Sequence, residues 1–305
     1  MKPAAFEYSR PADLDEACAM LAQGEDVRLI AGGQTLVPLM AMRLARPKRL
    51  IDIARIGELV FVRRQGDAVA IGAATKQCAL ECDGLIGADV PLLAKVMPLI
   101  GHAPIRARGT VGGSIANADP AAEIALVAVI LDAIMVYREE TRSAEIAASD
   151  FFVGPMTTVL SPASCLTCVR FPIWREQRIG VGFHEVSARR SDFAFASAGA
   201  QIALDGNGVC RRLALGIGAV AGVPLRLKAL ERALVDLAMA GRVFADSPAA
   251  ESTLRQQVAA AIADVDPLSD LHASADYRRR AATSLLVRAI TDAHRDAKGE
   301  PHRAH

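Results

Sequence analysis

A glycine-rich stretch in the middle of the chain, residues 109–120 (GTVGGSIANADP), places the strongest constraint on the fold. Its three glycines allow the backbone to approach a ligand closely and to adopt positive φ. Asp119 followed by Pro120 predicts a helix start, with Asp119 as the N-cap and Pro120 as the first helical residue. A glycine loop that leads into a helix suits a phosphate-bearing ligand, because free amides can point at oxygen. A tight turn before a capped helix explains the same residues, so this stretch alone leaves both interpretations open.

A second glycine pair, in residues 31–36 (AGGQTL), lies in an α/β unit. Residues 27–31 are predicted as a strand, 36–44 as a helix and 50–53 as the next strand. Neither glycine stretch has the G-x-G-x-x-G pattern of a dinucleotide-binding turn, and neither is followed by the Gly-Lys-Ser/Thr of a P-loop. The two stretches therefore indicate a different kind of phosphate contact.

The remaining pattern divides the 305 residues into three predicted domains: 1–56, 57–176 and 177–305. Residues 60–72 are predicted as a hairpin that turns at Gly66-Asp67, and 79–99 as two helices that separate at Pro91. Residues 166–171 are a predicted strand that Pro172 ends. The third domain begins with strands that include a hairpin turn at 205–208 (DGNG) and is mainly helical after residue 225.

Composition excludes several functional classes. The chain is 52% hydrophobic, enough for a sizeable core, and its net charge of +1 predicts no nucleic-acid surface. The longest apolar run, residues 124–136, contains Asp132 and is too short to cross a bilayer, and residues 1–6 lack the apolar segment of a signal peptide. Six cysteines in a chain of this length fit free thiols in a reducing compartment, so we expect a cytoplasmic protein.

Two cysteine pairs resemble chemical sites but are interpreted as structural. Cys165 and Cys168 have C-x-x-C spacing, yet they run into a strand, where an odd separation sends side chains to opposite faces. Cys78 and Cys82 lie one helical turn apart, so a four-thiol site is conceivable, although buried free cysteines are the better explanation. The sequence leaves the roles of all four open. We find no other metal-ligand spacing and no G-x-S-x-G hydrolase motif.

Taken together, the two glycine stretches resemble the FAD-binding medium subunit of the molybdenum hydroxylases, the family of aerobic carbon monoxide dehydrogenases and xanthine dehydrogenases. The resemblance covers nearly the whole chain in the same order. Besides the glycine stretches, it includes residues 39–47 (LMAMRLARP), 71–75 (IGAAT), 98–106 (PLIGHAPIR), 150–157 (DFFVGPMT), 170–172 (RFP), 189–194 (RRSDFA) and 275–279 (ADYRR).

The resemblance implies an α+β fold. Two α/β subdomains of the PCMH/vanillyl-alcohol-oxidase type would enclose FAD, and a C-terminal domain of antiparallel sheet and helices would follow. It also implies an oxidoreductase subunit for electron transfer, in which FAD performs the redox chemistry and no catalytic side chain or metal ligand is needed. A large partner subunit would carry the molybdenum cofactor and a small one two [2Fe-2S] clusters, in a dimer of heterotrimers. The holoenzyme's substrate and the final acceptor (NAD, a quinone or oxygen) cannot be inferred.

The resemblance assigns the cofactor-binding residues. One group would line one side of the diphosphate and ribityl chain: Ile30, Ala31, Gly32, Gly33, Gln34, Thr35, Leu36 and Val37. The opposite side would be lined by Thr110, Val111, Gly112, Gly113 and Ser114. Hydroxyls of Thr35, Thr110 and Ser114 would donate to phosphate oxygens. Further contacts are assigned to Ile100, Glu123, Leu166, His184, Asp192 and Phe193.

Several of these further assignments have an ordinary structural alternative. Glu123 is implied at the sugar or adenine end of FAD, but an acidic residue in the first turn of a helix is also favoured by the helix dipole. Ile100 is implied near the flavin and is equally suited to a core. His184 aligns with a lysine that some members place near the ring, although an isolated histidine is more often structural. Phe193 aligns with an aromatic residue beside the isoalloxazine.

A self-contained flavin oxidoreductase of related fold is the alternative function. Such an enzyme would need its own substrate pocket and acid–base residues in the C-terminal domain, and the sequence offers no convincing set there.

Overall fold

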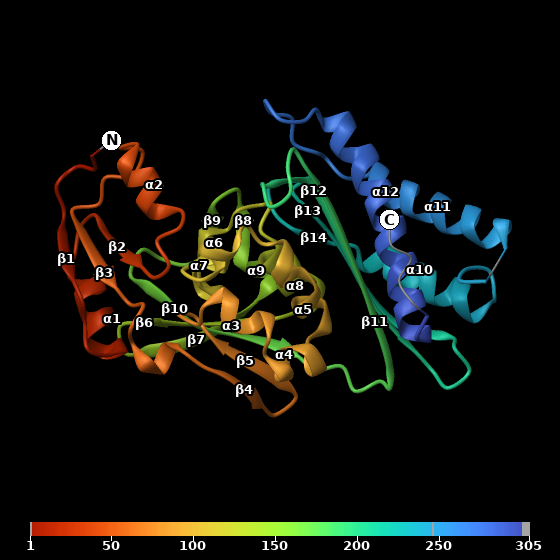
Figure 1. Cartoon of the computed structure of the whole chain (residues 1–305), viewed down its shortest axis with the longest axis horizontal. Helices are drawn as coiled ribbons and strands as arrows, with labels where there is room; N and C mark the ends of the chain where they lie inside the picture. The colour runs from red at the N-terminus through yellow and green to blue at the C-terminus, as the bar shows by residue number, and fades with distance from the viewer. Residues whose placement is uncertain (1, 246, 301–305) are drawn as a thin grey trace.

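A computed structural model describes residues 2–245 and 247–300. The chain is an α+β protein that forms three units along its longest axis (Figure 1). In each of the three larger sheets, all strands come from one continuous part of the sequence. All expected strands of the N-terminal α/β unit and of both hairpins are present. The fold class therefore agrees with the expectation.

The N-terminal unit is a small parallel sheet with two helices. Its elements are β1 (Glu7–Ser9), α1 (Leu14–Ala22), β2 (Val27–Ile30), α2 (Leu36–Ala41) and β3 (Arg49–Asp52), and the strand order is β1-β3-β2. Asp13 caps α1 by accepting a hydrogen bond from the amide of Glu16. The parallel arrangement brings the end of β2, and so the first glycine stretch, to one edge of the sheet.

The middle unit is an antiparallel sheet covered by short helices, with strand order β4-β5-β10-β6-β7. Its elements are η1 (Gly57–Leu59), β4 (Val62–Gln65), β5 (Ala68–Gly72), α3 (Gln77–Glu81), α4 (Gly84–Asp89), α5 (Pro91–Val96), η2 (Met97–Leu99), α6 (Ala103–Arg106), α7 (Val111–Asn117), α8 (Glu123–Ile130), β6 (Ile134–Glu139), β7 (Arg142–Ala147), α9 (Ala148–Phe151), β8 (Phe152–Gly154), β9 (Thr157–Thr158) and β10 (Ser164–Pro172). Residues 79–99 hold one more break than expected, because Asp83 starts α4 as an N-cap.

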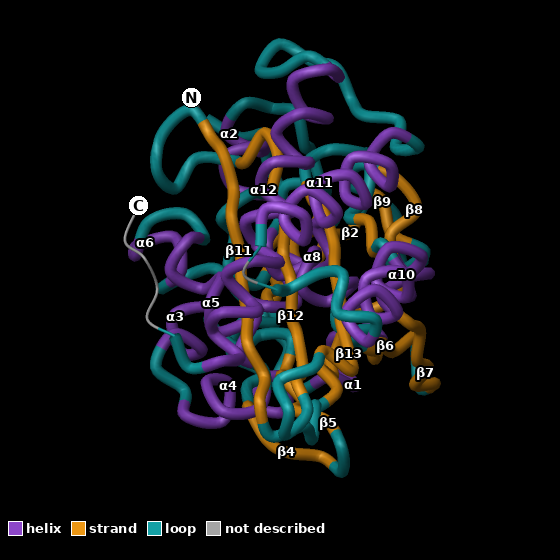
Figure 2. Tube along the Cα trace, turned by 90° about the vertical axis from the view of Figure 1, so that its right-hand side faces the viewer, coloured by secondary structure: helices purple, strands orange, loops and turns teal. Residues whose placement is uncertain are grey.

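The C-terminal unit is a four-stranded antiparallel sheet with three helices on one face. Its elements are β11 (Arg178–Ser187), β12 (Ala194–Leu204), β13 (Cys210–Gly218), β14 (Leu225–Arg226), α10 (Lys228–Met239), α11 (Pro248–Ala263) and α12 (Ala275–Lys298). Figure 2 looks onto this sheet from the side of its helices, with β11, β12 and β13 next to one another. Within the described residues, no helix is both long and apolar enough to cross a membrane.

The C-terminal sheet has two differently covered faces. Helices α10, α11 and α12 cover one face, and α5 and α8 of the middle unit lie on the other (Figure 1). Helix α8 sits on glycines of β12 and β13: a Cβ added at Gly216 would lie 2.5 Å from Ile130 Cγ1, and one at Gly199 would lie 2.8 Å from Ile130 Cδ1. One continuous hydrophobic core therefore joins the middle unit to this face of the C-terminal sheet.

The central glycine stretch is not a loop that feeds a helix at Asp119. Residues from Val111 to Asn117 are themselves helix α7, and Thr110 is its N-cap. Ala118 then takes a left-handed conformation (φ 50°), and Asp119 accepts a hydrogen bond from the amide of Ala121 in a turn. Helix α8 begins only at Glu123, so the expected N-cap role of Asp119 is wrong. Glu123 itself is the first residue of the helix.

Candidate functional site

The first glycine stretch forms an open loop between β2 and α2. Gly33 has φ 70°, a conformation that glycine adopts without strain. Among the residues that the structure describes, no hydrogen bond takes up the amides of Gly32, Gly33, Gln34 and Thr35. Gln34 Nε2 donates to Gly32 O at 3.0 Å, which fixes the side chain against the loop. Four consecutive unpaired amides offer a set of donors that suits an anion such as a diphosphate.

The two glycine stretches meet at Gly32. A Cβ added to Gly32 would lie 2.5 Å from Arg108 O and 2.8 Å from Gly109 Cα. Real Cβ atoms do not approach other atoms so closely, so only glycine permits this contact between the N-terminal and middle units. The structure thus brings together two segments that are about eighty residues apart in the sequence, as the resemblance implies.

The second stretch contributes fewer free donors than the first. The amides of Val111 and Gly112 donate to Thr75 O and Ala73 O, and those of Gly113 and Ser114 donate to the hydroxyl and carbonyl of Thr110. Thr110 is buried, so its hydroxyl serves the helix cap. Gly113 is exposed on α7, and the half-buried hydroxyl of Ser114 has no partner within the described chain. The unpaired amides are therefore concentrated in the first stretch.

Two half-buried carboxyl groups, those of Glu123 and Glu185, lie near each other where α8 meets the C-terminal sheet. The pKa of Glu123 is raised to about 8, mainly by burial and to a smaller extent by the nearby Glu185 and Asp119. Burial also raises the pKa of Glu185 to about 7. Glu185 Oε2 is buried and, in the described part of the chain, accepts no hydrogen bond. Both carboxyls therefore hold protons at pH values where exposed carboxyls are ionised.

Glu185, rather than its neighbour His184, faces the middle unit. Gly180 and Gly182 of β11 lie against α12, whereas Val181 and Phe183 belong to the core shared with the middle unit. Since side chains alternate along a strand, His184 lies on the α12 face and Glu185 on the opposite face. His184 Nε2 is 2.8 Å from Asp292 Oδ2 on α12, which supports the structural interpretation of this histidine. Sequence reasoning missed Glu185 because the faces of a strand cannot be assigned before its neighbours are known.

The other assigned residues divide into buried and exposed groups. Ile100 and Leu166 are buried in the shared core. Asp192 is exposed, and Phe193 is 73% exposed in the turn between β11 and β12. Val37 is also exposed at the start of α2. The structure thus gathers the two glycine stretches but leaves Phe193 exposed at the surface.

The cysteines do not form a site within the described residues. Cys165 and Cys168 pair with Arg138 and Val136 of β6, across a β-bulge, so both point to the same face of the sheet. The expected opposite orientation is therefore wrong, because the bulge inserts one residue between them. All six cysteines are free, but Cys78 and Cys82 are exposed, so the expectation that they are buried is wrong. In the part of the chain that the structure describes, no group of three potential ligands is placed to hold a metal ion.

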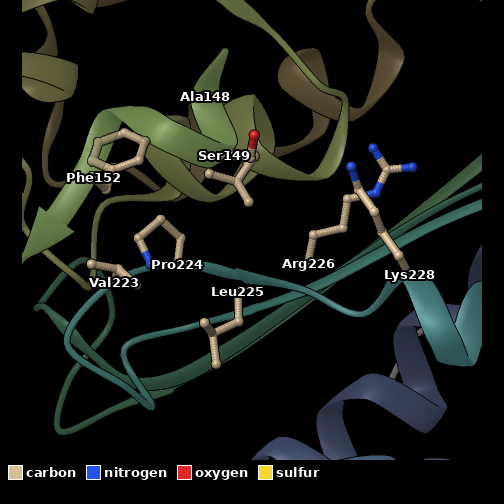
Figure 3. A pocket seen from close by; sticks show the side chains of 9 residues that line it. Ala148, Ser149, Phe152, Val223, Pro224, Leu225, Arg226 and Lys228 are labelled. Carbon is tan, nitrogen blue, oxygen red and sulfur yellow. The ribbon is translucent and has the colours of Figure 1, made fainter. Parts of the chain in front are cut away.

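A pocket between the middle and C-terminal units lies away from the glycine stretches. It has a volume of about 320 Å³ and is lined by α9 and β8 on one side and by residues 223–228 on the other (Figure 3). Arg226 and Lys228 lie together at one end, and both form ion pairs with Asp132. Since its cations are already paired and its walls include none of the assigned residues, we do not assign the cofactor to this pocket.

Comparison with known proteins identifies the family. The family model described as "FAD binding domain in molybdopterin dehydrogenase" matches residues 4–174, and "CO dehydrogenase flavoprotein C-terminal domain" matches residues 182–293. The chain belongs to the family of FAD-binding medium subunits of molybdenum hydroxylases. It is therefore an oxidoreductase subunit whose cofactor is FAD, as the resemblance predicted.

Individual relatives support this membership over the full length. The carbon monoxide dehydrogenase medium chain of Afipia carboxidovorans is 34% identical over 98% of this chain and 100% of its own length. The caffeine dehydrogenase subunit beta of Pseudomonas sp. (strain CBB1) is 34% identical over 96% of both. A structure of carbon monoxide dehydrogenase from Hydrogenophaga pseudoflava superposes with a TM-score of 0.89 at 32% identity, over 97% of this chain and 99% of that one. These likenesses favour the medium-subunit function over a self-contained flavin oxidoreductase.

Replacing Glu185 with glutamine is expected to remove part of the pH dependence of stability. Above pH 4.5 the unfolded chain releases protons that the folded chain retains up to pH 7 or 8 on Glu185 and Glu123, so the free energy of unfolding falls across this range. Allowing for the partial exposure of Glu185, the Glu185→Gln substitution should raise the free energy of unfolding by about 2 kcal/mol at pH 8 and by much less at pH 5. Urea unfolding of the FAD-free full chain at both pH values measures this. Glu25→Gln, at an exposed carboxyl, is the control, and equal pH dependence in the two variants would contradict the prediction.

Proposed function

We propose that this chain holds FAD between residues 30–37 and 110–114 and serves as the electron-transfer subunit of a heterotrimeric molybdenum hydroxylase. The observation that carries the proposal is the contact of Gly32 with Arg108 and Gly109, beside four unpaired amides. A Cβ would fill this contact, and the amide cluster offers the donors that a diphosphate requires, so the residues present fit FAD.

Each part of the site has a proposed role. The amides of residues 32–35, with the hydroxyls of Thr35 and Ser114, bind the diphosphate. Ile30, Ala31, Leu36, Val37, Val111, Gly112 and Gly113 shape the walls around the rest of the cofactor, and Thr110 fixes the start of α7. Glu123 faces the cofactor as an uncharged hydrogen-bonding group near neutral pH, since burial raises its pKa to about 8. When bound, FAD supplies the redox chemistry by accepting electrons and releasing them to an external acceptor.

The partners follow from the family. We propose a large subunit with the molybdenum cofactor and a small subunit with [2Fe-2S] clusters, arranged as a dimer of heterotrimers. Electrons would pass from the iron–sulfur clusters to FAD on this chain. Exposed Phe193 and Asp192 are available either to the flavin or to one of these partners. We also propose a cytoplasmic location, since the six free cysteines suit a reducing compartment, and domain boundaries after residues 56 and 176.

The visible absorption spectrum tests this function. The chain is purified alone, with FAD supplied, and also after expression with both partner subunits. We expect flavin absorbance in both samples and reduction of the flavin by an organic substrate only in the complex. Absence of flavin from both samples would contradict FAD binding. Flavin reduction by an organic substrate in the isolated chain would instead favour a self-contained flavin oxidoreductase.

A further inference from the structure

Lys76 lies at the junction of the two glycine stretches. It is a half-buried residue in the turn between β5 and α3, where it pairs with Thr110 through an isolated β-bridge. Its Nζ donates a hydrogen bond to Arg108 O at 2.9 Å. The same carbonyl oxygen would lie 2.5 Å from a Cβ on Gly32. The ammonium group of Lys76 and the loop of unpaired amides therefore both lie next to the carbonyl oxygen of Arg108.

The positive charge of Lys76 has no close protein counterion. In the described part of the chain, no carboxylate lies within 4 Å of its Nζ. Asp52 is the nearby acidic group, but it already accepts a hydrogen bond from Tyr8 and lies 3.6 Å from Arg10. Burial lowers the pKa of Lys76, and the neighbouring Arg108 lowers it further, whereas Asp52 and Cys78 oppose the change. The site therefore holds a partly desolvated cation beside unpaired donors, and an anion bound there would stabilise it.

We propose that Lys76 binds the diphosphate of FAD as its cationic partner, together with the amides of Gly32, Gly33, Gln34 and Thr35. A diphosphate carries two negative charges at neutral pH, and backbone amides neutralise only part of them through their dipoles. Because the lysine side chain is flexible and its ammonium group has three protons, it can exchange the carbonyl for a phosphate oxygen or donate hydrogen bonds to both. This inference rests on the proposed binding of FAD and adds a residue that the glycine pattern does not include.

Titration of FAD into the FAD-free full chain, followed by flavin fluorescence, tests the proposal. Lys76→Met keeps the aliphatic stem and removes the charge, and we expect its Kd to rise about tenfold. The dependence of Kd on salt should also become weaker, because one attractive charge is lost. Lys95→Met removes the same charge from an exposed position on α5 and should leave both quantities unchanged. Lys76→Arg retains the charge and should bind FAD more tightly than Lys76→Met.

Inorganic pyrophosphate gives a second readout that does not depend on the flavin. It should raise the thermal midpoint of the FAD-free wild-type chain and of Lys95→Met, and raise that of Lys76→Met by less. An unchanged Kd in Lys76→Met would overturn the proposal. So would a raised Kd with unaltered salt dependence and an undiminished pyrophosphate effect, because Lys76 would then only brace the Arg108 carbonyl. Failure of the wild-type chain to bind FAD would instead refute the proposed function itself.

Discussion

Replacing Gly32 with valine is expected to weaken FAD binding by at least about 100-fold. The new Cβ would lie 2.5 Å from Arg108 O and 2.8 Å from Gly109 Cα, and both are backbone atoms that cannot rotate away. The two glycine stretches must then separate, which displaces the amides of residues 32–35 from the opposite wall. Flavin content after purification and the Kd for FAD measure the effect.

A matched control separates this effect from the general cost of valine at a glycine. Gly57 is exposed in η1, and a Cβ there would meet no atom within 4 Å, so Gly57→Val should bind FAD like the wild type. Circular dichroism should show Gly32→Val still folded, because Gly32 lies in a surface loop rather than in the core. Normal flavin content in folded Gly32→Val would show that the cofactor does not bind at this junction.

Replacing Gly182 with valine is expected to lower the free energy of unfolding by at least about 3 kcal/mol. Gly182 of β11 faces α12 so closely that a Cβ would lie 2.0 Å from Ala289 O. Helix α12 would have to move away from the sheet and lose contacts along its buried side. Urea unfolding measures the change.

The control for this second substitution is Gly154→Val in β8. A Cβ at Gly154 would lie 3.9 Å from Thr157 Cβ, an ordinary contact, so this variant should unfold near the wild-type urea concentration. Equal unfolding midpoints for Gly182→Val and Gly154→Val would mean that α12 packs less closely on β11 than the structure shows.

The sequence predicts elements well where the signal is local. The strand that ends at the first glycine pair, the helix after it and the hairpin turn at residues 205–208 all depend on short-range pattern and turn chemistry. The turn at Gly66-Asp67 likewise forms between β4 and β5. In these cases neighbouring residues supply most of the information that determines the structure.

Helix α7 could not be predicted because its stability comes from distant residues. Its sequence contains two glycines and two small polar residues, Ser114 and Asn117, which favour a loop. Packing makes the helix possible instead: a Cβ on Gly112 would lie 2.4 Å from Ala73 Cβ, and the amides of Val111 and Gly112 bond to the turn after β5. The prediction that α8 starts at Pro120 was wrong for a related reason. The carbonyl oxygen of Pro120 accepts a hydrogen bond from the amide of Ala219, which belongs to the C-terminal unit.

The site shows the same division between local and distant information. Both glycine stretches could be selected from the sequence, because glycine has few alternatives where backbones touch. Lys76 and Glu185 could not, because their importance depends on which carbonyl and which sheet face lie next to them. His184 was selected in place of Glu185, one position away, and a shift of one residue in a strand reverses the face.

The glycines beneath α8 have a consequence for movement within the subunit. Because Gly199 and Gly216 let α8 pack closely on the C-terminal sheet, residues 124–130 of that helix are buried in one core that the middle and C-terminal units share. Sliding or opening the two units apart would expose this shared interior to water, at a cost that grows with every apolar side chain uncovered. We therefore expect the two units to move as one rigid body during turnover, with any adjustment around the flavin confined to surface turns such as the one that carries Phe193.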